Sequence, residues 1–447
     1  MIRELHLKDV GPSRDLKFEF APRLNILTGD NGLGKSFVLD VAWWALTGDW
    51  AGEIAYPWRS VTPVDPGPLT PQILATFAPD HDSEGSTVDA AYDWDTQVWH
   101  YRAVEPANLV VYARIDGSFA IWDGYQARED QEDPFGGAEV LLDVAEVWDG
   151  KEIEGRDKRR RTVCRGLLED WVTWQGTRAT EFESLRRALT LLSDPEDPLV
   201  PGSPTRVRLD DRRDIPTLEM PYGLVPILMA SAGQRRVLAL AYMLVWTWAE
   251  HRKTAALKRH RPSPSMVVLI DEVELHLHPR WQRVLLPAIM QAIRTIAPDV
   301  SVQIVATTHA PMVLASIEPY FDEELDNLYR FERHGPVVEA NNLRFAKQGD
   351  VANWLVSETF GLDLPRSAPS EAAIQAASAF MRGDTADAES ALKTAIDALG
   401  SPPFDPSADL RTRIHATLCR LVPGHDDFWP RWIVSHERSL ARDEGER

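Results

Sequence analysis

The stretch Gly29-Asp-Asn-Gly-Leu-Gly-Lys-Ser36 decides the fold of this chain. It fits the pattern G-x-x-x-x-G-K-[ST], follows the short apolar run Leu24–Thr28 and precedes the helix-like segment Ser36–Leu46. In such a strand–loop–helix unit, glycines let backbone N–H groups close around phosphate oxygens, and the helix N-terminus attracts anions. We therefore expect Lys35 to contact the β and γ phosphates of a nucleotide and Ser36 to bind Mg²⁺. The candidate nucleotide-binding residues of this loop are Gly29, Asn31, Gly32, Gly34, Lys35 and Ser36.

Two carboxylates follow a second apolar run, in the stretch MVVLIDEVELHLHP. The run Met266–Ile270 is typical of a buried parallel strand, and Asp271 and Glu272 come directly after it. Carboxylates beside a polyanionic nucleotide require a metal ion that offsets the charge. We expect Asp271 to hold Mg²⁺ through water and Glu272 to polarise the attacking water. On its own this pattern is weak, but after a phosphate loop it predicts nucleotide hydrolysis.

Two more patterns complete the set. The stretch SAGQRR, Ser231 to Arg236, opens a long helical segment, and IVATTHAP is an apolar strand followed by His309. A histidine after a strand is usually structural, but its position after the other three motifs favours a functional role.

The four motifs, in this chain order, resemble those of the ABC-type ATPases. Within them, DEVELHLHP and TTHAP resemble the RecF/SMC-like and OLD-like branch of AAA-type ATP-binding proteins. Residues 1–50 and 225–320 carry this resemblance. It implies ATP as the nucleotide, Mg²⁺ as the cofactor, and a homodimer or higher oligomer that forms through the ATP sites.

The resemblance also implies roles for single residues. Ser231 and Gly233 of one copy would contact the γ-phosphate held by Lys35 of the other. Glu272 would be the general base, and His309 would sense the γ-phosphate. Hydrolysis and opening of the dimer would then be coupled, because a second copy completes each site.

The chain departs from the family pattern in three ways. Its signature reads S-A-G-Q-R, without the second glycine of L-S-G-G-Q. The glutamine that couples the lobes has only Gln72 as a candidate. No metal-dependent nuclease motif follows His309, which separates the chain from OLD proteins proper.

The expected fold is α/β: a P-loop ABC-type ATPase core with a mixed sheet, an antiparallel β subdomain, a helical signature subdomain and a C-terminal helical extension. We expect an N-terminal ATPase lobe over residues 1–150 that holds the phosphate loop and an acidic β block. Residues 151–230 are expected to be a helical or linker insertion. Residues 231–335 form the predicted C-terminal lobe with the signature, the Asp-Glu strand and the histidine, and residues 336–447 the helical extension.

Composition limits the partners. The 447 residues contain 48 Lys and Arg against 68 Asp and Glu, a net charge of −20, which disfavours coating DNA or an anionic membrane. The basic segments TRVRLDDRRD and KRRR leave local contact with DNA open. The interleaved aspartates of the first equally predict a self-paired turn, and a solvated loop is favoured for the second. Two cysteines fit no disulfide framework or zinc motif, and the most apolar stretch is too short to span a bilayer. We expect a soluble, cytoplasmic protein without a membrane partner.

The C-terminal region GDVANWLVSETFGLDLPRS, continuing to PGHDDFWPRW, resembles stand-alone ATPases of bacterial operons that pair with an HNH-type nuclease, as in Septu-like anti-phage systems. The alternative for this region is a helical cap that only packs on the ATPase. The sequence therefore predicts a dimeric ATP-binding and hydrolysing switch that controls a partner effector, a nuclease, in bacterial anti-phage defence or DNA processing. The alternative is a RecF/SMC-like DNA-repair clamp that acts on DNA directly.

Overall fold

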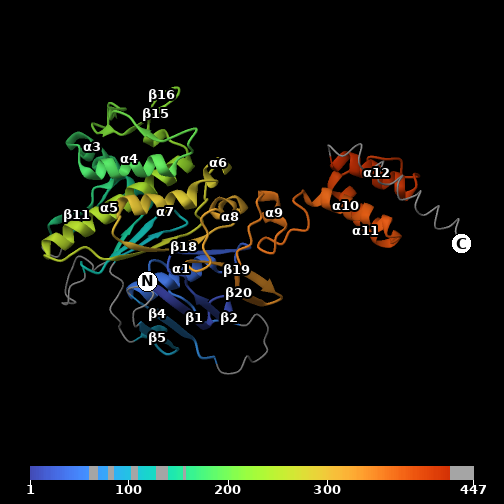
Figure 1. The fold of residues 1–447 in the computed structure, drawn as a ribbon, viewed down its shortest axis with the longest axis horizontal. Helices are drawn as coiled ribbons and strands as arrows, with labels where there is room; N and C mark the ends of the chain where they lie inside the picture. The colour runs from blue at the N-terminus through green and yellow to red at the C-terminus, as the bar shows by residue number, and fades with distance from the viewer. Residues whose placement is uncertain (60–68, 79–84, 102–108, 127–138, 155–157, 423–447) are drawn as a thin grey trace. The chain divides into compact units, whose positions relative to one another are not determined.

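The computed structural model describes residues 1–59, 69–78, 85–101, 109–126, 139–154 and 158–422. The chain forms two units, Met1–Val351 and Ala352–Arg447 (Figure 1). The stretch PGHDDFWPRW, which contributed to the C-terminal resemblance, lies outside the described residues.

A mixed sheet of eight described strands is the centre of the first unit. Its five middle strands run parallel, because β3 lies between β19 and β18, β18 pairs with β17, and β17 pairs with β7. The outer strands β20, β8 and β9 pair antiparallel. This arrangement confirms the predicted mixed sheet. In spatial order the strands are β20 (Val337–Leu343), β19 (Asp326–His334), β3 (Leu24–Gly29), β18 (Ser301–Thr307), β17 (Ser265–Ile270), β7 (Leu109–Ala113), β8 (Phe119–Asp123) and β9 (Glu139–Leu142).

A second sheet is antiparallel throughout its described strands and packs against the first sheet with helix α1. Apolar side chains of β1, β2 and α1 form one buried cluster with alternate residues of the large sheet, such as Val267, Leu269 and Val305. Trp43 of α1 is fully buried in this cluster. The strands, in spatial order, are β2 (Ser13–Glu19), β1 (Ile2–Val10), β4 (Gln72–Phe77), β5 (Ser86–Asp93) and β6 (Val98–Tyr101), and α1 covers Lys35–Thr47.

The predicted acidic β block is divided between the two sheets. Strands β4 to β6 join the antiparallel sheet, whereas β7 to β9 join the large one. The expectation of a wholly antiparallel block is wrong for β7, which pairs parallel with β17. Likewise β20 belongs to the large sheet, although the sequence assigned residues 336–343 to a helical extension.

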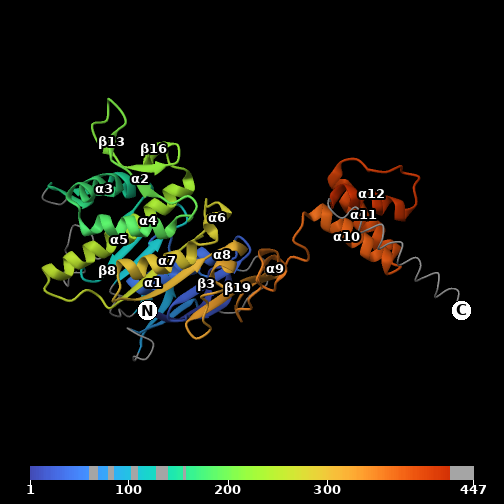
Figure 2. The same ribbon diagram turned by 45° about the horizontal axis from the view of Figure 1, so that its top comes forward.

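Helices cover the other face of the large sheet (Figures 1 and 2). The long helix α5 packs on β7 and β8, and α4 and α7 pack beside it. A buried chain of polar groups ties this region together: the Cys164 thiol lies 3.2 Å from the Tyr242 hydroxyl, which donates to Asp170 at 2.8 Å. The helices are α2 (Val144–Asp149), α3 (Gly166–Thr177), α4 (Thr180–Leu192), η1 (Ile227–Met229), α5 (Ala232–Leu257), α6 (Pro279–Gln282), α7 (Leu285–Ile296) and α8 (Pro311–Ile317).

Short strands extend from this helical layer. They form the pairs β10–β11 and β13–β14 and a three-stranded sheet in the order β12-β15-β16. The bounds are β10 (Lys151–Glu154), β11 (Arg160–Cys164), β12 (Val200–Pro201), β13 (Thr205–Arg206), β14 (Asp214–Ile215), β15 (Thr217–Met220) and β16 (Gly223–Pro226).

The second unit is helical. Helix α9 (Val351–Val356) begins at the boundary, and α10 (Ala368–Met381), α11 (Thr385–Leu399) and α12 (Leu410–Leu421) share a small core rich in alanine. In the described part of the whole chain, no helix is both long enough and apolar enough to cross a membrane.

Candidate nucleotide-binding site

Three motifs meet at one edge of the large sheet. The phosphate loop follows β3, His309 follows β18 after Thr308, and Asp271 and Glu272 follow β17. These strands are parallel neighbours in the order β3-β18-β17, so their carboxyl ends lie side by side. The carboxyl edge of a parallel sheet is where α/β proteins bind ligands. The structure therefore brings together the residues that the sequence placed 236 positions apart, Lys35 and Asp271.

The phosphate loop leads directly into the first turn of α1. Gly34 has a left-handed φ of 93°, and a Cβ at this position would lie 2.6 Å from Cγ of Pro12. Only glycine fits both the backbone conformation and the space. Asn31 and Gly32 are exposed, while Gly29 and Ser36 are half-buried.

Lys35 is the cation of this loop. Its side chain is nearly buried, and Nζ donates to the carbonyl oxygens of Gly29 at 3.0 Å and Asp30 at 2.7 Å. Burial lowers the pKa of Lys35 to about 8, and the negative charges of Glu272 and Asp271 oppose this shift. A polyanion bound here would add to that opposition and favour the charged ammonium.

Asp271 is held rigidly at the end of β17. It is 1% exposed, and Oδ1 accepts a hydrogen bond of 2.7 Å from the Thr307 hydroxyl. The same hydroxyl accepts the backbone N–H of Glu272 at 2.7 Å. Sequence reasoning missed Thr307, although its position at the end of an apolar strand next to the Asp-Glu strand was a usable signal.

Glu272 and His309 are less enclosed. Their side chains are 26% and 27% exposed, and Oε1 of Glu272 lies 3.7 Å from Nε2 of His309. Glu272 has a positive φ of 45°, a conformation that costs energy for a residue with a Cβ. This turn places the Glu272 carboxylate within reach of both water and His309.

A second acid lies on the phosphate-loop helix. Asp40 comes one helical turn after Ser36, and Oδ1 accepts a hydrogen bond of 3.0 Å from the Tyr112 hydroxyl. Burial raises the pKa of Asp40 to about 6, and the charge of Asp271 adds to this shift. Sequence reasoning missed this pair, because β7 and α1 are joined only by the fold.

Ser231 and Gly233 lie on a separate element, at the start of α5. Ser231 is exposed, and its hydroxyl accepts the N–H of Gln234 as a helix cap. Gly233 packs so closely against the loop after β17 that a Cβ would lie 2.7 Å from the His276 carbonyl oxygen. Arg236 donates to the Asp271 carbonyl oxygen at 3.1 Å. The first turns of α5 are therefore tied to the Asp-Glu strand of the same chain.

The remaining sequence candidates have local partners. Nε2 of Gln72 donates to Asp89 at 2.6 Å on β4 and β5. In the basic segment around β13 and β14, Arg208 pairs with Asp210 and Arg213 with Asp211. These pairs agree with the self-paired turn that the interleaved aspartates predicted.

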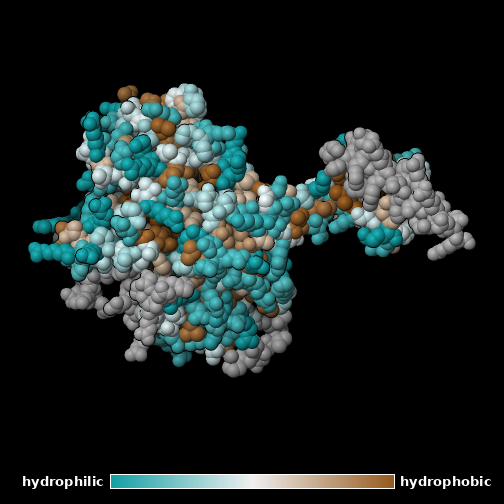
Figure 3. Space-filling view, in the orientation of Figure 1, coloured by the Kyte–Doolittle hydropathy of each residue, from teal (hydrophilic) through white to brown (hydrophobic). Residues whose placement is uncertain are grey.

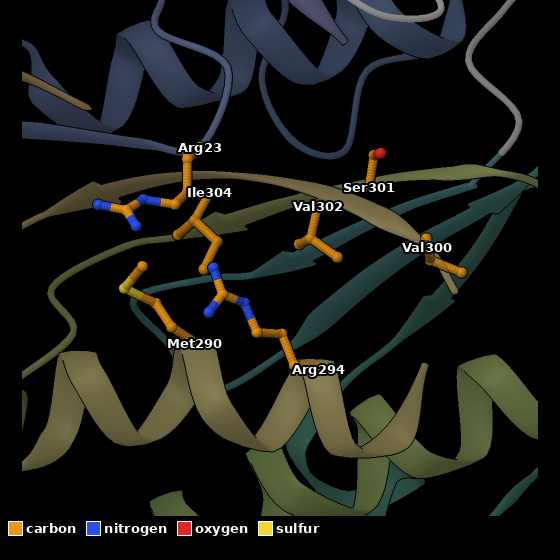
Figure 4. A pocket seen from close by; sticks show the side chains of 7 residues that line it. All are labelled: Arg23, Met290, Arg294, Val300, Ser301, Val302 and Ile304. Atoms are coloured by element: carbon orange, nitrogen blue, oxygen red, sulfur yellow. The ribbon is translucent and has the colours of Figure 1, made fainter. Parts of the chain in front are cut away.

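A surface hollow lies away from the phosphate loop, between α7 and the beginning of β18 (Figure 4). His309 follows the opposite end of β18, so this hollow is separate from the site described above. One of its cations, Arg23, is already paired with Asp326. The lining residues are Arg23, Met290, Arg294, Val300, Ser301, Val302 and Ile304.

Two family models match the parts of the chain that form this site. One, described as "AAA domain", matches residues 4–53. The other, described as "AAA domain, putative AbiEii toxin, Type IV TA system", matches residues 221–315. The chain is therefore similar to AAA domains in these two segments. The phosphate loop lies in the first matched segment, and the signature, the Asp-Glu strand and His309 lie in the second.

Several curated proteins are similar in sequence to this chain. The Septu protein PtuA of Bacillus thuringiensis is 21% identical to this chain, and the match covers 82% of this chain and 86% of PtuA. The "Retron Ec83 probable ATPase" of Escherichia coli is 27% identical over 30% of this chain, which spans only 21% of that protein. The "Retron Vc95 probable ATPase" of Vibrio cholerae is 37% identical over 16% of this chain and 13% of its own length.

Among solved structures, the chain matches the SMC head domain from Thermotoga maritima with 15% identity and a TM-score of 0.37. That match covers 77% of this chain and 99% of the head domain. The recombination mediator protein RecF matches with 11% identity and a TM-score of 0.36, over 76% of this chain and 98% of its own.

Proposed function

We propose that the protein is a dimeric ATP-binding and ATP-hydrolysing switch that controls a partner effector. The observation that carries the proposal is the meeting of the phosphate loop, the Asp271–Glu272 pair and His309 at one edge of the sheet. We assign residues 1–150 and 231–335 to the two lobes of the ATPase, with β20 completing the sheet of the second lobe, 151–230 to an insertion, and the helical part of 336–447 that follows Val351 to the C-terminal extension.

The residues at this edge suit ATP and Mg²⁺. Lys35 would bind the β and γ phosphates, and Ser36 and Asp271 would bind the metal ion. Asp271 offers carboxylate oxygens, and the Thr307 hydroxyl fixes its orientation. This suits Mg²⁺, which prefers oxygen ligands and usually keeps phosphate and water oxygens as well. When bound, Mg²⁺ would neutralise phosphate charge during transfer.

Glu272 is the proposed general base. Its partly exposed carboxylate would take a proton from water as the water oxygen attacks the γ-phosphorus, and the bond to ADP breaks. His309, 3.7 Å from Glu272, would hydrogen-bond the γ-phosphate.

A second copy of the chain would complete each site through Ser231 and Gly233. The exposure of Ser231 supports its part in this role, since a donor for another copy must lie on the surface, whereas Gly233 is buried against the loop after β17. The segment that leads into Ser231 also exposes large apolar side chains, including Leu224 at 55% and Met229 at 70%. Figure 3 shows hydrophobic residues at the surface around β15 and β16. Exposed apolar groups of this kind favour a protein partner over solvent.

For the cellular role we propose anti-phage defence or DNA processing in the bacterial cytoplasm, with a nuclease, of HNH type, as the effector. The similarity to the Septu protein over most of both chains supports this proposal. The similarity to two retron ATPases points to the same setting. Copurification of the chain with the product of a neighbouring gene would test the effector.

The proposed chemistry is tested with Glu272→Gln, which keeps the shape of the base and removes its proton affinity. We expect the variant to bind ATP with wild-type affinity, to release no phosphate, and to elute as a dimer with ATP. Lys35→Ala is the matched control, and it should neither bind ATP nor dimerise in its presence. Phosphate release by Glu272→Gln at the wild-type rate would disprove the assignment of the base.

The alternative is a clamp of RecF/SMC type that binds DNA directly. The basic segment around β13 and β14 supports it only weakly, because Arg208 and Arg213 are paired with aspartates. DNA binding by the purified protein alone, stimulated by ATP and lost at high salt, would favour the clamp. Binding that requires an added partner would favour the switch.

A further inference from the structure

We propose that Glu274 is a positioning residue of the hydrolytic site, which holds the loop of His309 in register with the turn of Glu272. The inference rests on the proposed hydrolysis. It adds a third carboxylate to the Asp-Glu pair, one that acts through its neighbours and not on the nucleotide.

The contact that carries this inference joins two segments of the sheet edge. Oε1 of Glu274 accepts the backbone N–H of His309 at 2.6 Å. A carboxylate that accepts a backbone N–H forms a charge-assisted hydrogen bond, which is stronger than a neutral one. This bond is a side-chain link between the Asp-Glu segment and the residue that carries the histidine.

The His309 loop has few other constraints. It consists of three residues between β18 and α8, and each has its N–H bonded in a different direction. Thr308 donates to the Leu27 carbonyl oxygen, and Ala310 donates to the Thr308 hydroxyl. Of the three N–H groups, therefore, that of His309 alone is bonded to the Asp-Glu segment. Without Glu274 this N–H would lose its acceptor.

The Glu272 turn depends on the same residue. Glu272 and His276 both have positive φ angles, 45° and 63°, so the turn that contains Glu274 is conformationally costly. Three backbone bonds hold the turn. Leu275 donates to the Glu272 carbonyl oxygen, Leu277 donates to the Glu274 carbonyl oxygen, and Val273 donates to the Thr307 carbonyl oxygen at the end of β18. Glu274 lies between these two strained positions. Its hydrogen bond to the His309 N–H therefore ties the strained turn to the neighbouring loop. This connection would act beside the hydrogen bonds from the Glu272 and Val273 N–H groups to Thr307, and it would help to set the 3.7 Å spacing of Glu272 and His309.

The carboxylate of Glu274 has two separable properties, its hydrogen bond to His309 and its charge. Oε2 of Glu274 is buried and has no hydrogen-bond partner among the described residues. Its charge nevertheless acts on Lys35, whose ammonium it favours. Glutamine would keep the acceptor for His309 and remove the charge, whereas leucine would remove both, and aspartate would keep the charge but fall short by one methylene.

The test compares ATP turnover of Glu274→Gln, Glu274→Asp and Glu274→Leu. We expect Glu274→Gln to keep kcat within about threefold of the wild type, and the other two to lose kcat by about tenfold or more with little change in KM. Both variants remove the hydrogen bond to the His309 N–H, one by shortening the side chain and one by removing the carboxylate. If one of them folds poorly, the other still tests the bond. Equal kcat for glutamine and leucine, or a loss confined to KM, would overturn the inference.

A double mutant tests whether Glu274 acts through His309. In the His309→Ala background, Glu274→Leu should lower kcat less than it does in the wild type, because only its effect on the Glu272 turn remains. If Glu274→Leu lowered kcat by the same factor in both backgrounds, so that the two losses multiplied, the inference would be contradicted. Glu318→Leu is the matched control: its carboxylate also accepts a backbone N–H, from Gln348 at 2.8 Å, but away from the site, and kcat should be unchanged.

The outcomes also separate this inference from the proposed function. Wild-type protein without phosphate release would end the proposed hydrolysis itself. Wild-type hydrolysis that is lost in Glu272→Gln but retained in Glu274→Leu and Glu274→Asp would refute the role of Glu274 alone.

Discussion

Thr307→Val removes one hydroxyl from the centre of the site without changing the volume of the side chain. That hydroxyl is fully buried, donates to Asp271 at 2.7 Å and accepts the Glu272 N–H at 2.7 Å. Valine would leave a charged oxygen and a buried N–H unpaired, at a cost of about 1–3 kcal/mol each. We therefore expect a loss of about 3 kcal/mol in the free energy of unfolding.

For a unit that covers Met1–Val351, this loss lowers Tm by about 4 °C, because the entropy of unfolding is about 2 cal/mol/K per residue. The assay is thermal unfolding followed by tryptophan fluorescence, with ATP turnover measured on the same samples. ATP turnover should fall by more than the loss of folded protein explains, since Asp271 loses the bond that orients it toward the metal ion.

Thr28→Val is the matched control. Thr28 lies in β3 of the same sheet and is also fully buried, but its hydroxyl has no hydrogen-bond partner among the described residues. Valine at this position removes an unpaired polar group, so Tm should stay the same or rise. Equal Tm losses in the two variants, or wild-type turnover by Thr307→Val, would refute the reasoning.

Two further predictions concern groups outside the site. Burial raises the pKa of the Glu139 carboxyl to about 7, beside the charge of Asp49, so the folded chain binds an extra proton between pH 4.5 and 7 and loses stability as pH rises. Glu139→Gln should therefore raise Tm at pH 8 and change it less at pH 5.5; an equal shift at both would contradict the raised pKa. Burial also raises the pKa of the Cys164 thiol to about 11, so an alkylating reagent at pH 8 should label Cys419 first; mass spectrometry of the peptides would expose the reverse order.

The sequence predicted the features that depend on a few consecutive residues. A phosphate loop needs glycines and a lysine at fixed spacing, so Lys35 and the strand before it were recognisable from eight residues. Chain order then placed Asp271 and His309 near it. The long apolar runs of β17 and β18 were equally readable, because parallel strands are buried on both faces.

What the sequence missed depends on partners distant in the chain. All five residues of β7 are buried, so its apolar run was a local signal for a strand covered on both faces, but the run does not reveal that its parallel partner is β17. The hydrogen bonds of Thr307, Glu274 and Arg236 join residues 35 or 36 positions apart, so their roles are visible only when the sheet has assembled.

The central claim is that each ATP site is composed of two copies of the chain. It is tested by mixing Lys35→Ala, which lacks the phosphate-loop cation, with Ser231→Arg, which lacks the signature hydroxyl. Each variant alone should release no phosphate. Mixed dimers should recover turnover, because one of their two sites combines an intact Lys35 with an intact Ser231. Full activity of Ser231→Arg alone, or no recovery from a mixture that forms mixed dimers, would contradict the claim.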